Sequence, residues 1–257
     1  MSRTYNAKVP LPLDLAHRRY VQQAGWTEPL RRHLLKRAGL SKAQRVLDVG
    51  CGTGAVLNTI NDASVSLIGL DLDLAALYLA RSQAPRACLA SGDAHQLPYR
   101  NGVFDIVYFH FVLLWLREPR RALAEARRVS RPGGAVLAFA EPDYSGRIDE
   151  PASLAQLGKL QTEALRAQGA DPELGRKLVS LFQSSGFTGI ESGQLHQQKG
   201  NAKKDDDGSL EWEILRADVR NQIPADELYR LAQEDRQARQ AGERVLFVPT
   251  FYACARV

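Results

Sequence analysis

The stretch Val46-Leu47-Asp48-Val49-Gly50-Cys51-Gly52-Thr53-Gly54 decides the fold of this chain, because it places a short apolar strand directly before a glycine-rich turn and a predicted helix start. The glycines let the backbone turn tightly and approach a ligand without interference from a Cβ atom. Asp48 stands just inside the strand end, where its carboxylate can order the N–H groups of the turn or meet a cationic ligand. We therefore expect a nucleoside cofactor to bind at this turn.

The residues after this turn predict strands that alternate with helices. The predicted strands cover residues 46–49, 65–70, 87–90, 104–109 and 135–140, and the predicted helices cover residues 55–60, 74–82 and 119–129. The last helix begins with proline in its first turn and ends before Arg131-Pro132-Gly133-Gly134. This spacing is typical of an α/β fold with a doubly wound, Rossmann-like, mostly parallel sheet and right-handed crossovers.

The pattern changes beyond Glu141, where helical segments interrupt the expected strands. The later segments are a helix at 154–168, a helix at 175–185, a strand at 188–197, a polar loop at 199–208, a mostly helical stretch at 212–241 and a last strand at 245–257. We interpret the chain as a single domain, residues 1–257, with an N-terminal helical cap (1–43), a cofactor-binding core (44–141) and helical insertions over the substrate site (143–172 and 199–243). The cap and insertions are long enough to form a lid.

Composition limits the classes of protein to which the chain can belong. Of its 257 residues, 44% are hydrophobic and 25% are charged, which is ordinary for a globular protein. No apolar stretch reaches the roughly 18 residues that span a bilayer, and the N-terminus has no apolar signal region, so we expect a cytoplasmic protein. The three cysteines have no paired spacing, and this predicts neither structural disulfides nor a bound metal such as zinc.

The net charge of +5 raises the question of a nucleic-acid partner. Most of the excess is arginine scattered along predicted helices, and no aromatic residues alternate with it as in a base-stacking surface. We therefore favour a solvated basic face over a nucleic-acid groove.

Acidic residues stand where the predicted strands end, which is where doubly wound sheets bind their ligands. Asp71 follows Gly50 at about the 20-residue interval at which an acidic residue meets ribose hydroxyls. The alternative role for Asp71 is a helix N-cap, which Asp73 could take instead. Asp93 ends the third strand, where it could accept a hydrogen bond from the amino group of adenine or only order a turn.

The glycine turn alone does not identify the cofactor. Gly50, Gly52 and Ala55 satisfy the dinucleotide pattern G-x-G-x-x-G/A, whereas Gly54 gives the alternative pattern G-x-G-x-G. A phosphate-binding P-loop is disfavoured, because no Lys-Ser or Lys-Thr pair follows the turn.

Taken together, five motifs in order resemble class I S-adenosylmethionine-dependent methyltransferases, and particularly the small-molecule branch typified by ubiquinone/menaquinone-biosynthesis enzymes. The motifs are Val46–Gly54, Ile68–Asp71, Ser91–Ala94, Phe104–Val107 and Arg131–Gly134. The resemblance covers residues 44–141 well and extends more loosely to residue 185 and the last strand. It implies a seven-stranded sheet that ends in an antiparallel C-terminal hairpin.

The resemblance also implies roles for residues that match its motifs. The implied cofactor-binding residues are Asp48, Gly50, Cys51 and Gly52 around the methionine part, Asp71 on both ribose hydroxyls, Leu72 on adenine, Asp93 and Ala94 at the adenine amino edge, and His110 at the methionine end or facing the acceptor. The implied cofactor is S-adenosyl-L-methionine, which becomes S-adenosyl-L-homocysteine, and the implied partner is a small organic acceptor methylated at an O, N or C atom.

Methyl transfer from a sulfonium ion depends mainly on alignment and exclusion of water, so a general base is needed only for some acceptors. The candidates for such a base are His110, Glu141, Asp143 and Tyr144, each of which could instead cap or bind a loop. Four aromatic residues could line the lid, although each is more often part of a core: Tyr20, Trp26, Trp212 and Tyr229. Two other functions stay open, an NAD(P)-dependent oxidoreductase and a cofactor-binding protein without turnover.

Overall fold

A computed structural model describes residues 11–195, 208–220 and 222–257 of the chain. Its centre is a seven-stranded sheet with the strand order β3-β2-β1-β4-β5-β9-β7. The strands are β1 (Arg45–Val49), β2 (Ser66–Asp71), β3 (Cys88–Ser91), β4 (Phe104–Phe109), β5 (Ser130–Pro142), β7 (Thr188–Gln194) and β9 (Thr250–Arg256). The first five strands are parallel, and β9 runs antiparallel to both of its neighbours. This is the predicted doubly wound, Rossmann-like sheet.

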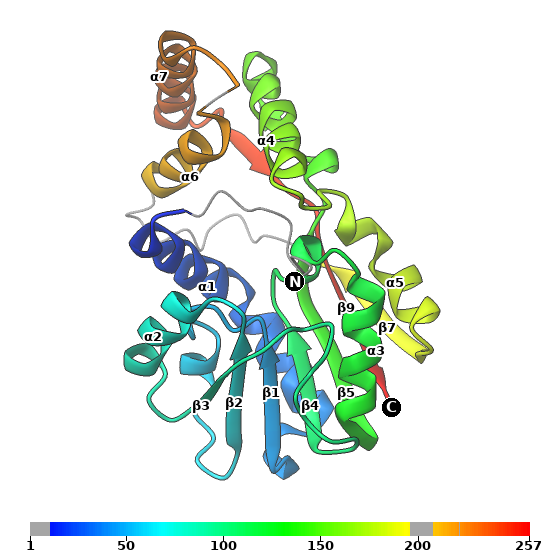
Figure 1. Cartoon of the computed structure of the whole chain (residues 1–257). Coiled ribbons are helices and arrows are strands. Elements are labelled where there is room, and N and C mark those ends of the chain that lie inside the picture. Colours follow the sequence, from blue (N-terminus) through cyan, green and yellow to red (C-terminus); the bar gives the residue numbers. More distant parts are fainter. Residues whose placement is uncertain (1–10, 196–207, 221) are drawn as a thin grey trace.

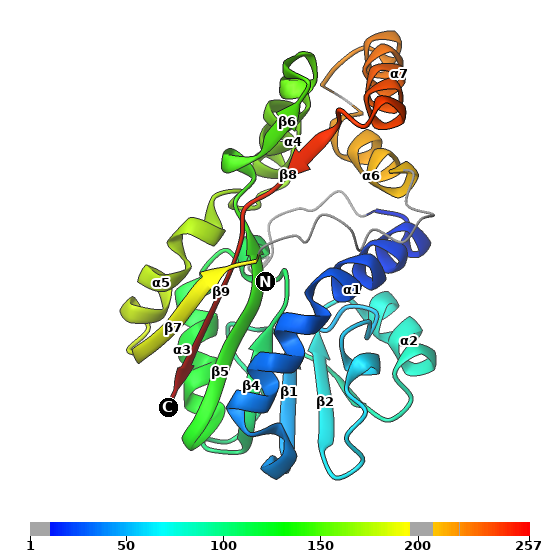
Figure 2. The same cartoon turned by 180° about the vertical axis from the view of Figure 1, so that it is seen from behind.

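Helices cover both faces of the sheet (Figures 1 and 2). One face carries α1 (Leu13–Ala38) and α2 (Leu74–Gln83), and the other carries α3 (Pro119–Val129) and α5 (Leu174–Ser184). Side chains alternate along β4, so Ile106 and Tyr108 pack in the cluster under α1, while Val107 and Phe109 pack in the cluster under α3. The central strands are apolar on both faces because both faces are buried.

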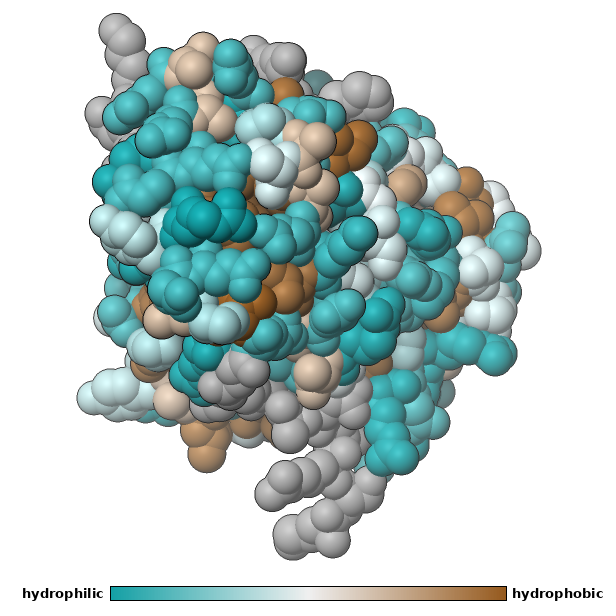
Figure 3. Space-filling view, turned by 90° about the horizontal axis from the view of Figure 1, so that it is seen from above, coloured by the Kyte–Doolittle hydropathy of each residue, from teal (hydrophilic) through white to brown (hydrophobic). Residues whose placement is uncertain are grey.

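A second group of elements stands above the carboxyl ends of the parallel strands (Figures 1 and 2). We call it the helical module; it comprises α4 (Ala155–Ala167), α6 (Ser209–Val219), α7 (Ala225–Ala241) and the antiparallel pair β6 (Ile148–Glu150) and β8 (Val245–Phe247). It has a small apolar cluster of its own, which includes Leu157, Leu215 and Leu231. Viewed from above, this end of the molecule is mainly hydrophilic, with hydrophobic residues in small patches (Figure 3).

The structure confirms most of the predicted elements. The helix predicted at 119–129 and the strand predicted at 104–109 have the observed bounds of α3 and β4. The stretch predicted to be mostly helical at 212–241 forms α6 and α7, which are separated before Pro224. The polar loop predicted at 199–208 lies outside the described residues except for Gly208.

Three predictions were wrong in their details. The helix expected at 55–60 is only a short 3-10 turn, Leu57–Thr59, because the segment holds the weak helix formers Asn58 and Thr59 and because α1 already covers this face. The fifth strand is longer than predicted. The last strand is divided at Pro249, so β8 joins the helical module and β9 alone enters the main sheet. The antiparallel pair β7 and β9 is therefore not a tight hairpin, since the helical module is inserted between its strands.

Among the described residues, no helix is both long and apolar enough to span a membrane. In the same part of the chain, no group of three or more His, Cys, Asp or Glu residues is arranged to hold a metal ion.

Candidate active site

The glycine turn after β1 has the left-handed backbone that its sequence predicts. Gly50 has a φ of 77° and Gly52 a φ of 52°. A Cβ atom at Gly50 would lie 2.6 Å from Cγ2 of Val112, and one at Gly52 would lie 3.0 Å from the ring of Tyr20. The N–H groups of Gly50 and Cys51 both donate to the carbonyl oxygen of Leu70, at 2.7 and 3.1 Å. The turn is thus held between β2, the loop after β4 and helix α1.

Asp71 connects the glycine turn to the start of α2. Its Oδ2 accepts a hydrogen bond of 2.7 Å from the N–H of Gly52, and its Oδ1 accepts one of 2.9 Å from the N–H of Asp73. The N-cap of α2 is Asp73, whose side chain accepts from the N–H groups of Ala75 and Ala76. Capping therefore does not explain Asp71. Desolvation raises the pKa of the Asp71 carboxyl.

Asp48 is almost fully buried on the α1 side of the sheet. Its Oδ2 accepts a hydrogen bond of 3.0 Å from the hydroxyl of Tyr108, which is also buried. Burial, opposed by this hydrogen bond and reinforced by the negative charge of Asp71, raises the pKa of Asp48 to about 8. A cationic group bound beside Asp48 would favour its ionised form.

His110 lies just past β4 and belongs to a polar cluster with helix α1. Its Nε2 lies 2.9 Å from Oγ1 of Thr27, which also accepts a 3.0 Å hydrogen bond from Nε of the buried Arg31. Desolvation, followed by the charge of Arg31, lowers the pKa of His110 well below its usual range. The imidazole is therefore neutral near pH 7. The following residue, Phe111, has a positive φ of 56°, which marks a constrained backbone at this strand end.

A buried histidine that sequence reasoning missed, His95, lies just past the end of β3. Oδ1 of Asp93 accepts hydrogen bonds from the N–H of His95 at 2.9 Å and lies 2.7 Å from its Nδ1. Nε2 of His95 accepts from the N–H of Glu118 at 3.3 Å. Ala94 is buried, whereas Leu72 is 42% exposed and available to pack against a ligand. The Asp-x-His spacing was the only sequence signal for this pair.

Two of the predicted base candidates have buried contacts of their own. Glu141 is fully buried, and its carboxylate accepts hydrogen bonds from the N–H groups of Val112, Leu113 and Leu114 at 3.0, 3.0 and 3.2 Å. Burial raises the pKa of Glu141 to about 7 despite these bonds. Oδ2 of Asp143 accepts from Nε of Arg176 at 2.6 Å. Glu141 thus fixes the loop after β4. These hydrogen bonds explain the position of the Glu141 carboxylate without a role in catalysis.

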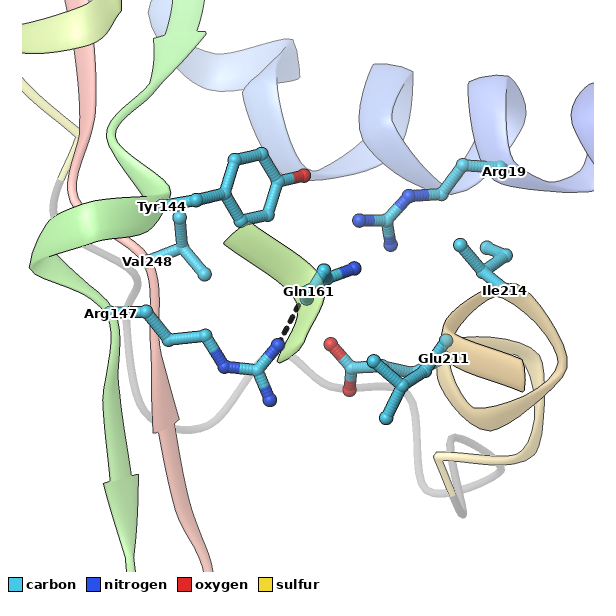
Figure 4. A pocket seen from close by; sticks show the side chains of 8 residues that line it. Arg19, Tyr144, Arg147, Gln161, Glu211, Ile214 and Val248 are labelled. Carbon is cyan, nitrogen blue, oxygen red and sulfur yellow. Dashed lines mark hydrogen bonds between the residues drawn. The ribbon is translucent and has the colours of Figure 1, made fainter. Parts of the chain in front are cut away.

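Tyr144, another of the predicted base candidates, lines a pocket between the sheet and the helical module (Figure 4). The pocket is lined by Arg19, Tyr144, Arg147, Gln161, Glu211, Ile214, Leu215 and Val248. The ring of Tyr144 and the guanidinium group of Arg19 point toward one another across it. His110, Glu141 and Asp143 do not line it, so the four candidates are not brought together in this pocket.

Helix α1 contributes more to the site than its sequence indicates. The ring of Tyr20 lies beside Gly52, and Nδ1 of His17 lies 2.8 Å from Oγ1 of the buried Thr53. Of the other aromatic residues expected to line a lid, Trp212 donates from Nε1 to Asp235 inside the helical module. Trp26 and Tyr229 are 42% and 62% exposed. No sequence motif marks the residues of α1 that contact the turn.

Comparison with known proteins finds a family profile that matches part of this chain. A family profile described as Methyltransferase domain matches residues 47–138, which run from β1 into β5. Residues 47–138 are thus similar to a methyltransferase domain. The domain contains Asp48, Asp71, Asp93 and His110, whereas α1, Tyr144 and the helical module lie outside the matched residues.

Curated relatives match about half of this chain. A demethylmenaquinone methyltransferase of Renibacterium salmoninarum is 36% identical over 126 residues, which cover 48% of this chain and 53% of the relative. A malonyl-acyl-carrier-protein O-methyltransferase of Erwinia pyrifoliae is 34% identical over 138 residues, which cover 53% of each protein. The chain thus spans about half the length of the curated relatives it matches.

Solved structures share the fold over most of this chain. The phosphoethanolamine N-methyltransferase 2 of Haemonchus contortus, in complex with phosphomonomethylethanolamine and S-adenosylhomocysteine, is 16% identical with a TM-score of 0.56; the match covers 89% of this chain and 52% of that one. The 4+2 cyclase SpnF is 22% identical with a TM-score of 0.56; the match covers 89% of this chain and 80% of that one. At these identities the likeness shows the fold alone.

Proposed function

We propose that this chain transfers the methyl group of S-adenosyl-L-methionine to a small organic acceptor. Because one fold supports many reactions, the proposal rests on the site. The observation that carries it is Asp71, whose carboxylate joins the glycine turn to the start of α2 and is not the N-cap of that helix. Each oxygen of this carboxylate accepts one of these N–H bonds and has capacity for another, as binding of two ribose hydroxyls requires.

The buried acids at the strand ends fit the charge of this cofactor. Burial raises the pKa of both Asp48 and Asp71, and the negative charge of Asp71 adds to the shift at Asp48. A bound sulfonium and ammonium group would offset that cost by favouring the ionised carboxylates. Asp48, Gly50, Cys51 and Gly52 would surround the methionine part, and Leu72, Asp93 and Ala94 the adenine.

We infer that the reaction depends on positioning more than on proton transfer. When bound, S-adenosyl-L-methionine supplies an electrophilic methyl group, which the lone pair of the acceptor takes while the sulfur keeps the electrons of the broken bond. Helix α1, through Tyr20 and His17, fixes the turn that would hold the donor. The neutral His110 is a weak base, and Glu141 is engaged by backbone N–H groups. Alignment and exclusion of water are then the main contributions of the chain.

Replacement of Asp71 by Ala tests the proposal. We expect Asp71→Ala to weaken binding of S-adenosylhomocysteine in isothermal titration calorimetry by about tenfold or more, since hydrogen bonds to a charged group contribute about 1.5–3 kcal/mol each. The matched control is Asp73→Ala, which removes the N-cap of α2 and costs about 1 kcal/mol of stability without removing a ribose contact.

The same titration separates the alternatives. Binding of NAD(H) in preference to S-adenosylhomocysteine would favour the oxidoreductase and overturn the proposal. Equal affinity of Asp71→Ala and the wild type for S-adenosylhomocysteine would remove the ribose role of Asp71. A protein that binds the donor but never transfers labelled methyl groups across a broad acceptor screen would be a binding protein without turnover.

A further inference from the structure

The pocket between α1 and the helical module has an unusual balance of charge. Its polar lining comes from Arg19 on α1, Tyr144 at the end of β5, Arg147 and Gln161, and Glu211 on α6 (Figure 4). The next residue on α1, Tyr20, lies against the glycine turn. Consecutive residues of α1 thus line the pocket and contact the proposed methyl-donor site.

Apart from Arg19, the charged residues that line this pocket are paired. Arg147 makes two hydrogen bonds of 2.7 and 2.8 Å to Asp149, and Arg244 donates to the same carboxylate at 2.6 Å. Arg239 donates to Asp235 at 2.7 Å and to Glu211 at 3.3 Å. Three arginines thus form ion pairs with three carboxylates, and these six residues together carry no net charge.

Arg19 is the cation of the pocket that forms no ion pair among the described residues. Its Nη1 donates to the side-chain oxygen of Gln22 at 2.9 Å, and its guanidinium carbon lies 4.9 Å from the centre of the Trp26 ring. Within residues 11–195, 208–220 and 222–257, no carboxylate lies within ion-pair distance of Arg19. In contrast, the adjacent Arg18 is paired with Glu213 at 2.6 Å.

A second donor faces Arg19 across the pocket. The hydroxyl of Tyr144 points toward the guanidinium group of Arg19 (Figure 4). Ile214, Leu215 and Val248 supply the apolar part of the lining. A half-buried cation, a phenolic donor and aliphatic side chains together suit a ligand with an acidic head and an apolar body.

We propose that the pocket binds the carboxylate of an apolar, monoanionic methyl acceptor, held by Arg19 and Tyr144. This inference rests on the proposed methyl transfer and names the chemical class of its acceptor. A single unpaired guanidinium group matches one negative charge, which favours a carboxylate over a phosphate monoester. Arg19 and Tyr144 would orient the acceptor at a distance from its reacting atom, and are positioning residues.

Binding of a simple probe tests this proposal. The full-length protein, saturated with S-adenosylhomocysteine, is titrated with hexanoate, hexanamide and hexyl phosphate by calorimetry or ligand-observed NMR. We expect the wild type to bind hexanoate about tenfold or more tightly than hexanamide, because only the carboxylate forms a charge-assisted hydrogen bond with arginine. Arg19→Gln should abolish this preference, and Arg19→Lys should keep part of it.

Arg18→Gln is the matched control, since it removes a cation one residue away that is paired outside the pocket. It should leave the preference for hexanoate unchanged, and Tyr144→Phe should reduce it by less than Arg19→Gln does. Equal binding of hexanoate and hexanamide, no binding of hexanoate, stronger binding of hexyl phosphate, or an unchanged preference in Arg19→Gln would each overturn the proposal.

Titration with S-adenosylhomocysteine separates the two proposals. Arg19→Gln should bind it with wild-type affinity, because Arg19 does not contact the glycine turn. If the wild type binds S-adenosylhomocysteine but shows no preference for hexanoate, the acceptor class is wrong and methyl transfer stands. If the wild type does not bind S-adenosylhomocysteine, methyl transfer itself fails.

Discussion

The sheet and the helical module are stabilised by different means. Each face of the sheet buries a large apolar cluster, and the acids that would meet a cofactor stand only at the strand ends. The helical module has a small apolar cluster and a buried group of ion pairs around Asp149 and Asp235. Apolar packing tolerates many sequences, whereas a buried ion pair depends on every partner being present. The helical module is therefore the part that single substitutions should disrupt most.

Removal of a buried carboxylate from the helical module should have the largest effect. Asp235 is 2% exposed and accepts hydrogen bonds from Arg239, Arg244 and Trp212. Asp235→Ala removes the carboxylate that Arg239 and Arg244 share and leaves the buried ion-pair group with one excess positive charge, although each arginine keeps one other carboxylate. Removal of one partner from a buried ion pair typically costs about 3–5 kcal/mol. We expect hydrogen exchange measured by mass spectrometry to become much faster in α6 and α7 while β1 and β4 stay protected.

The neighbouring Glu234 supplies the control for that experiment. It forms an exposed pair with Arg230 four residues earlier on α7. Such pairs contribute about 0.3–0.5 kcal/mol, so Glu234→Ala should leave exchange almost unchanged. If Asp235→Ala behaved like Glu234→Ala, or if it destabilised sheet and helical module equally, the two regions would not differ as we infer.

Within the sheet, the glycine turn should be the most sensitive point. Gly50→Ala places a Cβ atom 2.6 Å from Val112 in a backbone with a φ of 77°. Strain in the left-handed region and the steric clash together should cost about 2–4 kcal/mol of unfolding free energy. Chemical denaturation measures the loss, and binding of S-adenosylhomocysteine should weaken with it.

Gly25 on α1 is the control for Gly50, because its position has room for a Cβ atom. A Cβ atom there meets nothing within 4 Å, and the residue is exposed in a helix. Gly25→Ala should therefore stabilise the protein by about 0.5–1 kcal/mol. A loss of stability in Gly25→Ala similar to that in Gly50→Ala would show that the turn is not specially constrained.

The difference between the regions also explains how far the sequence could be interpreted. Strand 104–109 and helix 119–129 were predicted within their observed bounds, because apolar runs, a proline in the first turn and a following Pro-Gly-Gly are signals within a few residues. The acids at the ends of β1, β2 and β3 could be located because parallel strands end at one edge. These signals are local, or follow directly from the fold class.

The remaining contacts depend on residues that are far apart in sequence. Arg244 pairs with Asp149 across 95 residues, and as isolated charges both resemble ordinary solvated residues. The ring of Tyr20 lies beside Gly52 because α1 packs across this face of the sheet. The short turn Leu57–Thr59 does not cover that part of the face. Glu141 was predicted as a candidate base. The path of the loop after β4 decides whether this carboxylate binds backbone N–H groups or faces a ligand.

A change of pH tests whether the buried acid of the sheet is protonated. The pKa of Asp48 is raised from 3.8 to about 8, so the folded protein binds a proton that the unfolded chain has released, and stability should fall as pH rises from about 4 to 8. Asp48→Asn keeps an acceptor for the Tyr108 hydroxyl but does not titrate, so its stability relative to wild type should rise by about 1 kcal/mol or more from pH 5 to 8. Urea denaturation of the cofactor-free protein at several pH values measures this difference. Asp62→Asn is the control. Asp62 is exposed, and its hydrogen bonds with Ser64 lower its pKa. The stability of Asp62→Asn relative to wild type should therefore fall as pH rises, and at lower pH than for Asp48. A constant difference between Asp48→Asn and wild type would mean that Asp48 is already ionised and that the sheet, like the helical module, holds a buried charge.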